Sequence, residues 1–223
     1  MPTEPTGRRP LKSRDLPFFK NLAATLARAG VTPNGISFAS IVCGCCAGAA
    51  LAATAHSDCW LLRACWVGAA LGIQLRLIAN LLDGMVAVEA RKGGPTGDLW
   101  NEAPDRISDA AIFIGAGYAA GSAPVLGFAA ALVAVIVAYV RALGASVGAG
   151  QCFLGPQAKP QRMALMTGVC VLTAAVPVYP TAIGEQPLPA VAIALWVVIV
   201  GGLITAWRRL SFIADFLRKK SRP

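Results

Sequence analysis

The sequence has few charged residues for its length. Lys, Arg, Asp and Glu make up 14% of its 223 residues, whereas a soluble domain averages about 25%. Hydrophobic residues account for 56% of the chain. So few charges cannot cover a soluble surface, and the composition therefore predicts an integral membrane protein with one domain or at most two.

Acidic residues are scarcer than basic ones, with 11 against 20 and a net charge of +9. In a soluble protein this excess would indicate a nucleic-acid partner. Here the basic residues lie at the two ends and in short loops. That distribution instead predicts contact with the anionic surface of a lipid bilayer, and no nucleic-acid partner.

Histidine is almost absent, since His56 is the only one. Cys43, Cys45 and Cys46 are close in sequence, but only Cys43 and Cys46 share a helical face and no histidine is near them. We therefore interpret these cysteines as small packing residues rather than as a metal site. The first 35 residues also lack an early apolar core, so no cleavable signal peptide is expected.

Long uncharged runs follow this polar beginning. A membrane-spanning helix needs about 20 mostly apolar residues. The uncharged run at 110–140 is too long for one span, and the small residues and proline at 121–124 predict a turn within it. We predict six spans, at 36–54, 59–88, the two halves of 110–140, 163–184 and 186–207.

The loops and ends give the predicted orientation. Basic residues gather in the N-terminal segment, the loops after the second and fourth spans, and the tail. Both termini are therefore expected in the cytoplasm. The high Ala and Gly content favours a bacterial source, and hence an inner membrane. The chain divides into a cytoplasmic segment at 1–35, a six-helix domain at 36–207 and a basic tail at 208–223.

The segment at 16–28 precedes the first span. Phe19, Leu22, Ala23 and Leu26 fall on one face of a helix there. The pattern predicts an amphipathic helix on the cytoplasmic leaflet, and an ordinary leader to the first span is the alternative. The predicted fold is therefore all-α, with six transmembrane helices after an interfacial helix.

Polar residues occur at membrane depth, where a charge costs about 2.5–3.5 kcal/mol on insertion scales. Asn80 and Asp83 are three residues apart near the end of the second span. Asn101, Asp105 and Asp109 are spaced by four and so share one helical face. Carboxylate and amide oxygens that converge in this way suit a hard cation such as Mg²⁺, Mn²⁺ or Ca²⁺.

Internal salt bridges are the alternative explanation of these charges. Glu102 and Arg106 are an i,i+4 pair, and Arg106 is also spaced to neutralise Asp109. Gly84 and Gly97 flank the polar positions. Such small residues leave room for a ligand beside the backbone, or serve ordinary helix packing.

Residues 80–105 read N-L-L-D-G-M-V-A-V-E-A-R-K-G-G-P-T-G-D-L-W-N-E-A-P-D. This segment resembles the signature of the CDP-alcohol phosphatidyltransferases, D-x-x-D-G-x-x-A-R-(x)-G-x-x-x-D-x-x-x-D, in which (x) stands for the eight residues that correspond to 89–96 here. Residues Asp83, Gly84, Ala87, Gly97 and Asp105 match the signature by identity and spacing. The segments 30–34, 139–142 and 159–162 are similar to other parts of the family, so the resemblance covers essentially the whole chain.

The resemblance implies a phospholipid-biosynthetic transferase. The family moves a phosphatidyl group from a CDP-linked donor, such as CDP-diacylglycerol, to an alcohol and releases CMP. It implies that Asp83 binds a divalent metal, Mg²⁺ or Mn²⁺, and that Asp105 is the base or a second metal ligand. Gly84, Ala87 and Gly97 would make room for the nucleotide. Family members are commonly homodimers.

Three positions depart from the signature. Asn80 and Asn101 replace its first and third aspartates, and Val88 replaces its arginine. As metal ligands, amide oxygens are neutral and bridge two ions poorly. The sequence therefore leaves open whether the site binds one metal ion or two. Arg76 and Arg106 are spaced to hold phosphate directly.

Basic residues in the later spans suggest where an acceptor binds. Arg141, Lys159 and Arg162 suit a phosphorylated alcohol, or serve only as topology signals. The acceptor itself is not named by the sequence. Two other functions remain open: a catalytically impaired relative that binds CDP-lipid or regulates another enzyme, and a small membrane transporter.

Overall fold

The computed structural model describes residues 15–89, 97–176 and 190–220, and the long elements within these ranges are all helices. The predicted all-α class is confirmed. The helices are α1 (Pro17–Arg28), α2 (Pro33–Ala53), α3 (Cys59–Glu89), α4 (Gly97–Gly117), α5 (Pro124–Ser146), α6 (Lys159–Ala175) and α7 (Ala190–Lys220), with a 3₁₀ turn η2 (Thr54–His56) after α2.

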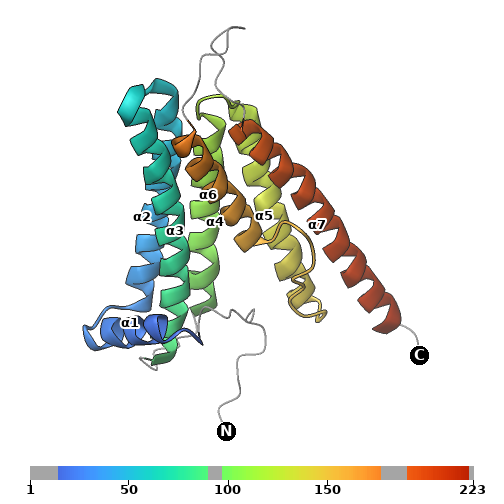
Figure 1. Ribbon diagram of the computed structural model, residues 1–223. Helices are drawn as coiled ribbons and strands as arrows, with labels where there is room; N and C mark the ends of the chain where they lie inside the picture. The colour runs from blue at the N-terminus through green and yellow to red at the C-terminus, as the bar shows by residue number, and fades with distance from the viewer. Residues whose placement is uncertain (1–14, 90–96, 177–189, 221–223) are drawn as a thin grey trace.

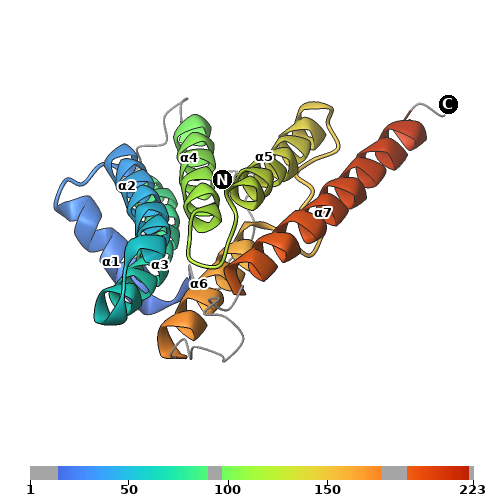
Figure 2. The same ribbon diagram turned by 90° about the horizontal axis from the view of Figure 1, so that it is seen from above.

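Helices α2 to α7 run alternately up and down one bundle, and α1 lies across its lower end (Figure 1). Seen from above, α2, α3 and α4 group together on one side and α5 and α7 lie on the other (Figure 2). The start of α2 and the end of α7 lie at the same end of the bundle as α1 (Figure 1).

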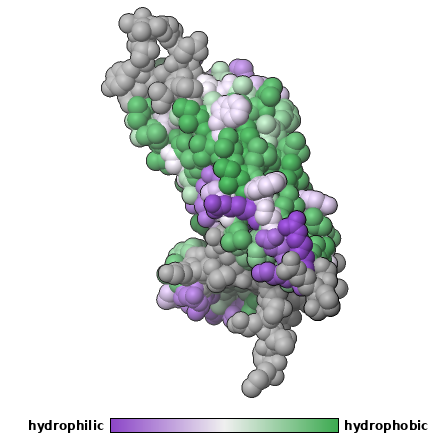
Figure 3. Space-filling model, turned by 90° about the vertical axis from the view of Figure 1, so that its right-hand side faces the viewer, coloured by the Kyte–Doolittle hydropathy of each residue, from purple (hydrophilic) through white to green (hydrophobic). Residues whose placement is uncertain are grey.

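Four helical segments are long and apolar enough to cross a membrane: α2 with η2, α3, α5 and α7. Helix α4 carries charged residues in its first half, and α6 has 17 residues within the described part. A broad hydrophobic zone covers the surface, with hydrophilic residues near the end where α1 lies (Figure 3). Exposed side chains such as Trp196 and Leu203 suit contact with lipid. The chain is therefore an integral membrane protein.

The predicted spans agree with the helices in part. Helix α3 covers the span predicted at 59–88, and Gly121, with φ of 73°, lies in the predicted turn. Helix α4 begins at Gly97, so it contains the acidic positions at 101–109 as well as the uncharged run from residue 110; its charged side chains pair mostly with those of α3, α5 and α6. Helix α7 continues to Lys220, beyond the predicted end at 207. The boundary predicted at 184–187 lies outside the described residues.

Helix α1 packs against the α2–α3 pair, near the start of α2 and the end of α3. Its Ala23 is buried with Leu82 and Val86 of α3. Phe19, Leu22 and Leu26 lie against this cluster, so the apolar face predicted for 16–28 contacts protein. Between the helices the chain turns at Gly30, and the Thr32 hydroxyl then caps α2. This places α1 beside the end of α3 that carries the polar motif.

Glycines allow α2 and α4 to touch. A Cβ atom on Gly115 would overlap the carbonyl oxygen of Gly48, and one on Gly44 would lie 2.6 Å from the Cβ of Ser108. Only the smallest residues permit such an approach. The contact fixes α4 against α2, and so it sets the position of the acidic face of α4.

Candidate active site

Asp105 and Asp109 are one helical turn apart on α4, and both are buried. Arg76 of α3 is fully buried and joins them. Its Nη2 donates to Oδ1 of Asp105 at 3.1 Å and to Oδ1 of Asp109 at 2.5 Å. The polar faces of α3 and α4 therefore meet, as their spacing predicts.

Helix α6 adds two more cations to the same carboxylates. Arg162 donates to Oδ2 of Asp109 at 3.0 Å, and the Lys159 ammonium donates to Oδ2 of Asp105. The predicted pairing of Arg106 with Asp109 is absent from the described interactions, because Arg76 and Arg162 hold that carboxylate. Lys159 and Arg162, both predicted to bind an acceptor, thus pair with acidic side chains.

Asn80 joins the cluster from α3. In the amide orientation that satisfies its neighbours, its nitrogen donates to Oδ1 of Asp105 at 3.2 Å and its oxygen accepts from the Lys159 ammonium. The amide at the first signature position therefore lies beside the last signature aspartate. Three helices, α3, α4 and α6, meet at this point.

Asp83 lies one turn beyond Asn80 and is 5% exposed. Ser37 of α2 donates to its Oδ2 at 2.8 Å. Its Oδ1 is buried without a hydrogen-bond partner among the described residues. Sequence reasoning missed Ser37; the available signal was that Ser37 and Ser40 lie on one face of an otherwise apolar run.

Glu102 links two arginines nearer the end of the bundle. It accepts from Arg106 of its own helix and from Arg141 of α5, so the predicted i,i+4 pair is present. Arg141 also contacts Gln151 and lies 5.9 Å from the ring centre of Phe153. One carboxylate thus holds two guanidinium groups near each other, at the edge of the buried cluster.

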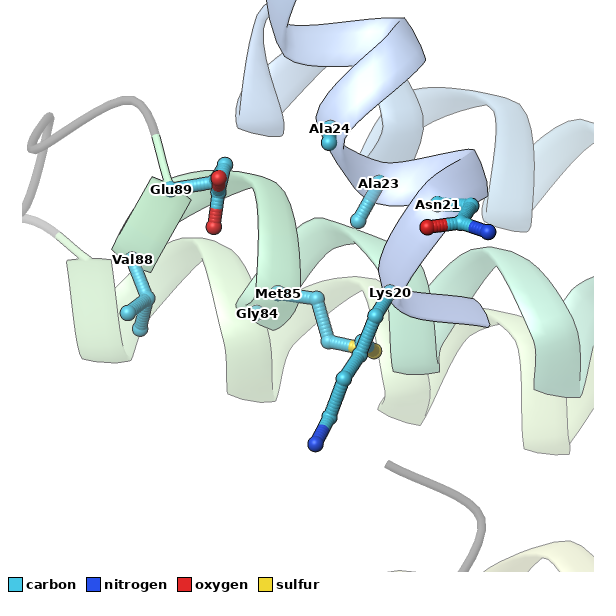
Figure 4. Close-up of a pocket in the computed structure, with 8 residues that line it drawn as sticks. All are labelled: Lys20, Asn21, Ala23, Ala24, Gly84, Met85, Val88 and Glu89. Atoms are coloured by element: carbon cyan, nitrogen blue, oxygen red, sulfur yellow. The ribbon is translucent and has the colours of Figure 1, made fainter. Parts of the chain in front are cut away.

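A cavity of about 530 Å³ opens between α1 and α3, next to the polar cluster. Lys20, Asn21, Ala23 and Ala24 line it from α1, and Gly84, Met85, Val88 and Glu89 line it from α3 (Figure 4). A Cβ atom on Gly84 would meet no atom within 4 Å, so this glycine leaves open space.

Three further predicted site residues, Ala87, Gly97 and Asn101, are not among the described residues of the cavity or of the polar cluster. Ala87 is partly buried on α3 and is not among the residues that line the cavity. Gly97 and Asn101 belong to α4, but their surroundings lie outside the described part of the structure.

The oxygen atoms of this cluster are of the kind that binds hard cations, and one of them has no partner among the described residues. In the ranges 15–89, 97–176 and 190–220, no three His, Cys, Asp or Glu side chains form a metal-binding group. The buried, unpartnered Oδ1 of Asp83 needs a partner, however. The oxygens of Asn80 and Asp105 are of the type that Mg²⁺ and Mn²⁺ prefer.

Comparison with known proteins finds one similar curated protein and several solved structures with the same fold. No model of a protein family matches the chain. The archaetidylinositol phosphate synthase of Aeropyrum pernix is 28% identical over 198 residues, which cover 89% of this chain and 91% of that protein. This similarity agrees with the resemblance of residues 80–105 to the CDP-alcohol phosphatidyltransferase signature.

Solved structures show that the fold is shared. Phosphatidylinositol phosphate synthase of Mycobacterium tuberculosis, in complex with manganese and citrate, superposes with a TM-score of 0.70 at 19% identity, covering 87% of this chain and 88% of that one. The same enzyme with CDP-DAG bound gives 0.66 at 20% identity, covering 89% and 94%.

The cavity between α1 and α3 differs from the signature at one position. Val88 stands where the signature has arginine, is 65% exposed and lines the cavity. The cavity therefore lacks the signature cation at that position. Lys20 of α1 is the basic residue that lines it instead.

Proposed function

We propose that this protein transfers a phosphatidyl group from CDP-diacylglycerol, or a similar CDP-linked lipid, to an alcohol and releases CMP. One observation carries the proposal. Asn80, Asp83 and Asp105, which occupy three of the four acidic signature positions, lie in one buried polar cluster beside an open cavity. The synthases named above support it, and one of them has been solved with CDP-DAG bound.

The donor binds in the cavity between α1 and α3. Gly84 leaves space there for the nucleotide, and Lys20 supplies a positive charge for phosphate. The acyl chains extend from this cavity into the surrounding lipid. A divalent cation, Mg²⁺ or Mn²⁺, supplies charge neutralisation to the pyrophosphate when it is bound beside Asp83.

Asp105 is the proposed base. The acceptor hydroxyl oxygen forms a bond to the lipid-side phosphorus, the P–O bond to CMP breaks, and Asp105 takes the hydroxyl proton. Arg76 and Lys159 hold this carboxylate in place, and each donates to one of its oxygens. We propose that Lys159 swings away when the acceptor binds, which frees Oδ2 of Asp105 for the proton.

The acceptor is proposed to be a phosphorylated alcohol. Arg141 and Arg106 lie at the rim of the cluster, and Glu102 orients both of them. An arginine pair of this kind suits a phosphate group. The similar archaetidylinositol phosphate synthase and phosphatidylinositol phosphate synthase named above support an acceptor of this class.

We also propose six transmembrane helices, α2 to α7, with α1 at the cytoplasmic surface. The alternation of the helices and the common end of α1 and the last residues of α7 support this (Figure 1). The domain limits at 35 and 207, the cytoplasmic ends, the bacterial inner membrane and a homodimer remain predictions, as does the absence of a nucleic-acid partner.

A catalytically silent lipid-binding or regulatory protein is the second candidate. Both Asp105 oxygens already accept from cations, and two signature aspartates are amides. These features would suit a protein that binds a CDP-lipid without turning it over.

One experiment separates the two candidates. The purified protein, in mild detergent, receives CDP-diacylglycerol, Mg²⁺ or Mn²⁺, and a panel of phosphorylated and neutral alcohols. We expect cation-dependent CMP release that is lost in Asp105→Asn. Folded protein that binds the donor but releases no CMP with any alcohol would leave only the binding function.

A further inference from the structure

The charges buried in the polar cluster are balanced without a metal ion. Three carboxylates face three cations within hydrogen-bonding or electrostatic reach; the groups are Asp83, Asp105, Asp109, Arg76, Lys159 and Arg162. Asn80, at the first signature position, is neutral. Added charge in a buried site needs compensation, because an unpaired charge at membrane depth is costly.

The balance limits how many divalent ions this cluster accepts. A pyrophosphate with two negative charges compensates one divalent cation. A second divalent ion would leave two positive charges without partners. Aspartates at positions 80 and 101 would supply those two negative charges, but this chain has asparagine at both.

The Lys159 ammonium already lies where a cation would bridge two oxygen ligands. It donates to Oδ2 of Asp105 and to the amide oxygen of Asn80. Asp83 lies one helical turn after Asn80 in α3, and its Oδ1 is buried without a partner among the described residues. The Lys159 ammonium thus occupies the position between Asn80 and Asp105, and Oδ1 of Asp83 remains available to bind an ion.

We propose that this site binds one divalent cation per chain, at Asp83, and that the ammonium of Lys159 replaces a second cation between Asn80 and Asp105. The inference rests on the proposed function for the identity of the site, but its test is a direct measurement of ion binding. Until the acceptor binds, the Lys159 ammonium supplies the second positive charge, and the site needs less divalent ion than a four-aspartate site.

Mn²⁺ is the probe, and CDP-diacylglycerol is present without an alcohol, because its pyrophosphate supplies the two negative charges that compensate one ion. Bound Mn²⁺ is measured by equilibrium dialysis and metal analysis on detergent-solubilised, monodisperse full-length protein. We expect one Mn²⁺ per wild-type chain and none in Asp83→Asn. The triple variant Asn80→Asp, Asn101→Asp, Lys159→Gln should bind two. Two ions, or none, in the wild type would overturn the inference.

The matched control carries both aspartates and keeps Lys159. It should bind a single ion with high affinity, because the ammonium still fills the second place. Two ions in this control, or one ion in the triple variant, would show that Lys159 is not a substitute for a cation.

Single substitutions test the same point if the multiple variants do not fold. Lys159→Gln should tighten Mn²⁺ binding about tenfold or more, because a nearby positive charge is removed. Lys159→Arg and Arg141→Gln should not, since one keeps the charge and the other removes a cation that pairs with Glu102. Equal tightening in Lys159→Gln and Arg141→Gln would overturn the inference.

CMP release after an alcohol is added to the same samples keeps the two hypotheses apart. One bound Mn²⁺ with no turnover would refute the transferase and leave the inference standing. Turnover with two bound ions would support the transferase and refute the inference of a single ion.

Discussion

Arg76 is the residue on which the acidic cluster depends most directly. Its side chain is fully buried and contacts both Asp105 and Asp109. Two of its nitrogens, Nε and Nη1, have no hydrogen-bond partner among the described residues. The carboxylates thus offset only part of its desolvation, so we attribute to Arg76 a positioning role. Direct contact with phosphate remains a prediction.

Removal of Arg76 should destabilise the protein. We expect Arg76→Met to cost about 3–5 kcal/mol, because it leaves two buried carboxylates with less compensation. Arg106→Met, whose partner Glu102 is partly exposed, should cost about 1 kcal/mol or less. Thermal unfolding in one detergent compares the two variants, and equal losses would contradict the difference.

A substitution of Arg141 tests whether the acceptor is a phosphorylated alcohol. We expect Arg141→Ala to raise the KM for a phosphorylated alcohol about tenfold or more, since a charged hydrogen bond contributes about 1.5–3 kcal/mol. The KM for a neutral alcohol should change little. Arg218→Ala, at the exposed end of α7, is the control. Similar losses with both acceptor types would argue against a phosphate contact.

At the level of elements, composition predicted the apolar helices well. The apolar runs at 36–54 and 59–88 became α2 and α3, since lipid-facing helices need little more than length and hydrophobicity. The uncharged run from residue 110 is only the second half of α4, and the stripe of Asn101, Asp105 and Asp109 belongs to the same helix, as its spacing predicted. The charged first half of α4 resembles a loop in a hydropathy pattern, but its side chains pair with α3, α5 and α6 and so allow a helix.

A substitution at Gly84 tests whether the cavity between α1 and α3 binds the donor. Gly84→Leu should fill open space, raise the donor KM several-fold and leave the fold intact, because a Cβ atom added at this glycine would have no neighbour within 4 Å. Gly68→Leu is a matched control, since Gly68 also lies in α3 with open space around it, outside the cavity. The measurement is CMP release as a function of CDP-diacylglycerol concentration. Equal effects of the two substitutions would remove the cavity from the donor site.

The molecule as a whole has one hydrophilic end. On the face shown in Figure 3, hydrophilic residues gather in the lower half and hydrophobic residues cover most of the upper half. The polar cluster, the donor cavity and the last residues of α7 all lie toward this end. A soluble acceptor and a lipid donor can therefore both reach the site.

This arrangement predicts the membrane topology. We expect green fluorescent protein fused after residue 223 to fluoresce in a bacterial host, because that reporter matures in the cytoplasm. Alkaline phosphatase inserted after Ser57, between α2 and α3, should be active because that turn faces the opposite side. The reverse pattern would overturn the orientation but not the helical bundle.

The sequence by itself determined the membrane class, the main apolar helices and the identity of the polar motif, because these depend on composition and on spacing along one helix. Tertiary structure decided which charges meet. Spacing alone cannot choose between a metal site and salt bridges, since the partners of Asp105 and Asp109 come from α3 and α6. The approach of α2 and α4 through Gly48 and Gly115, and the placement of Lys159 beside Asn80, exist only after the helices pack.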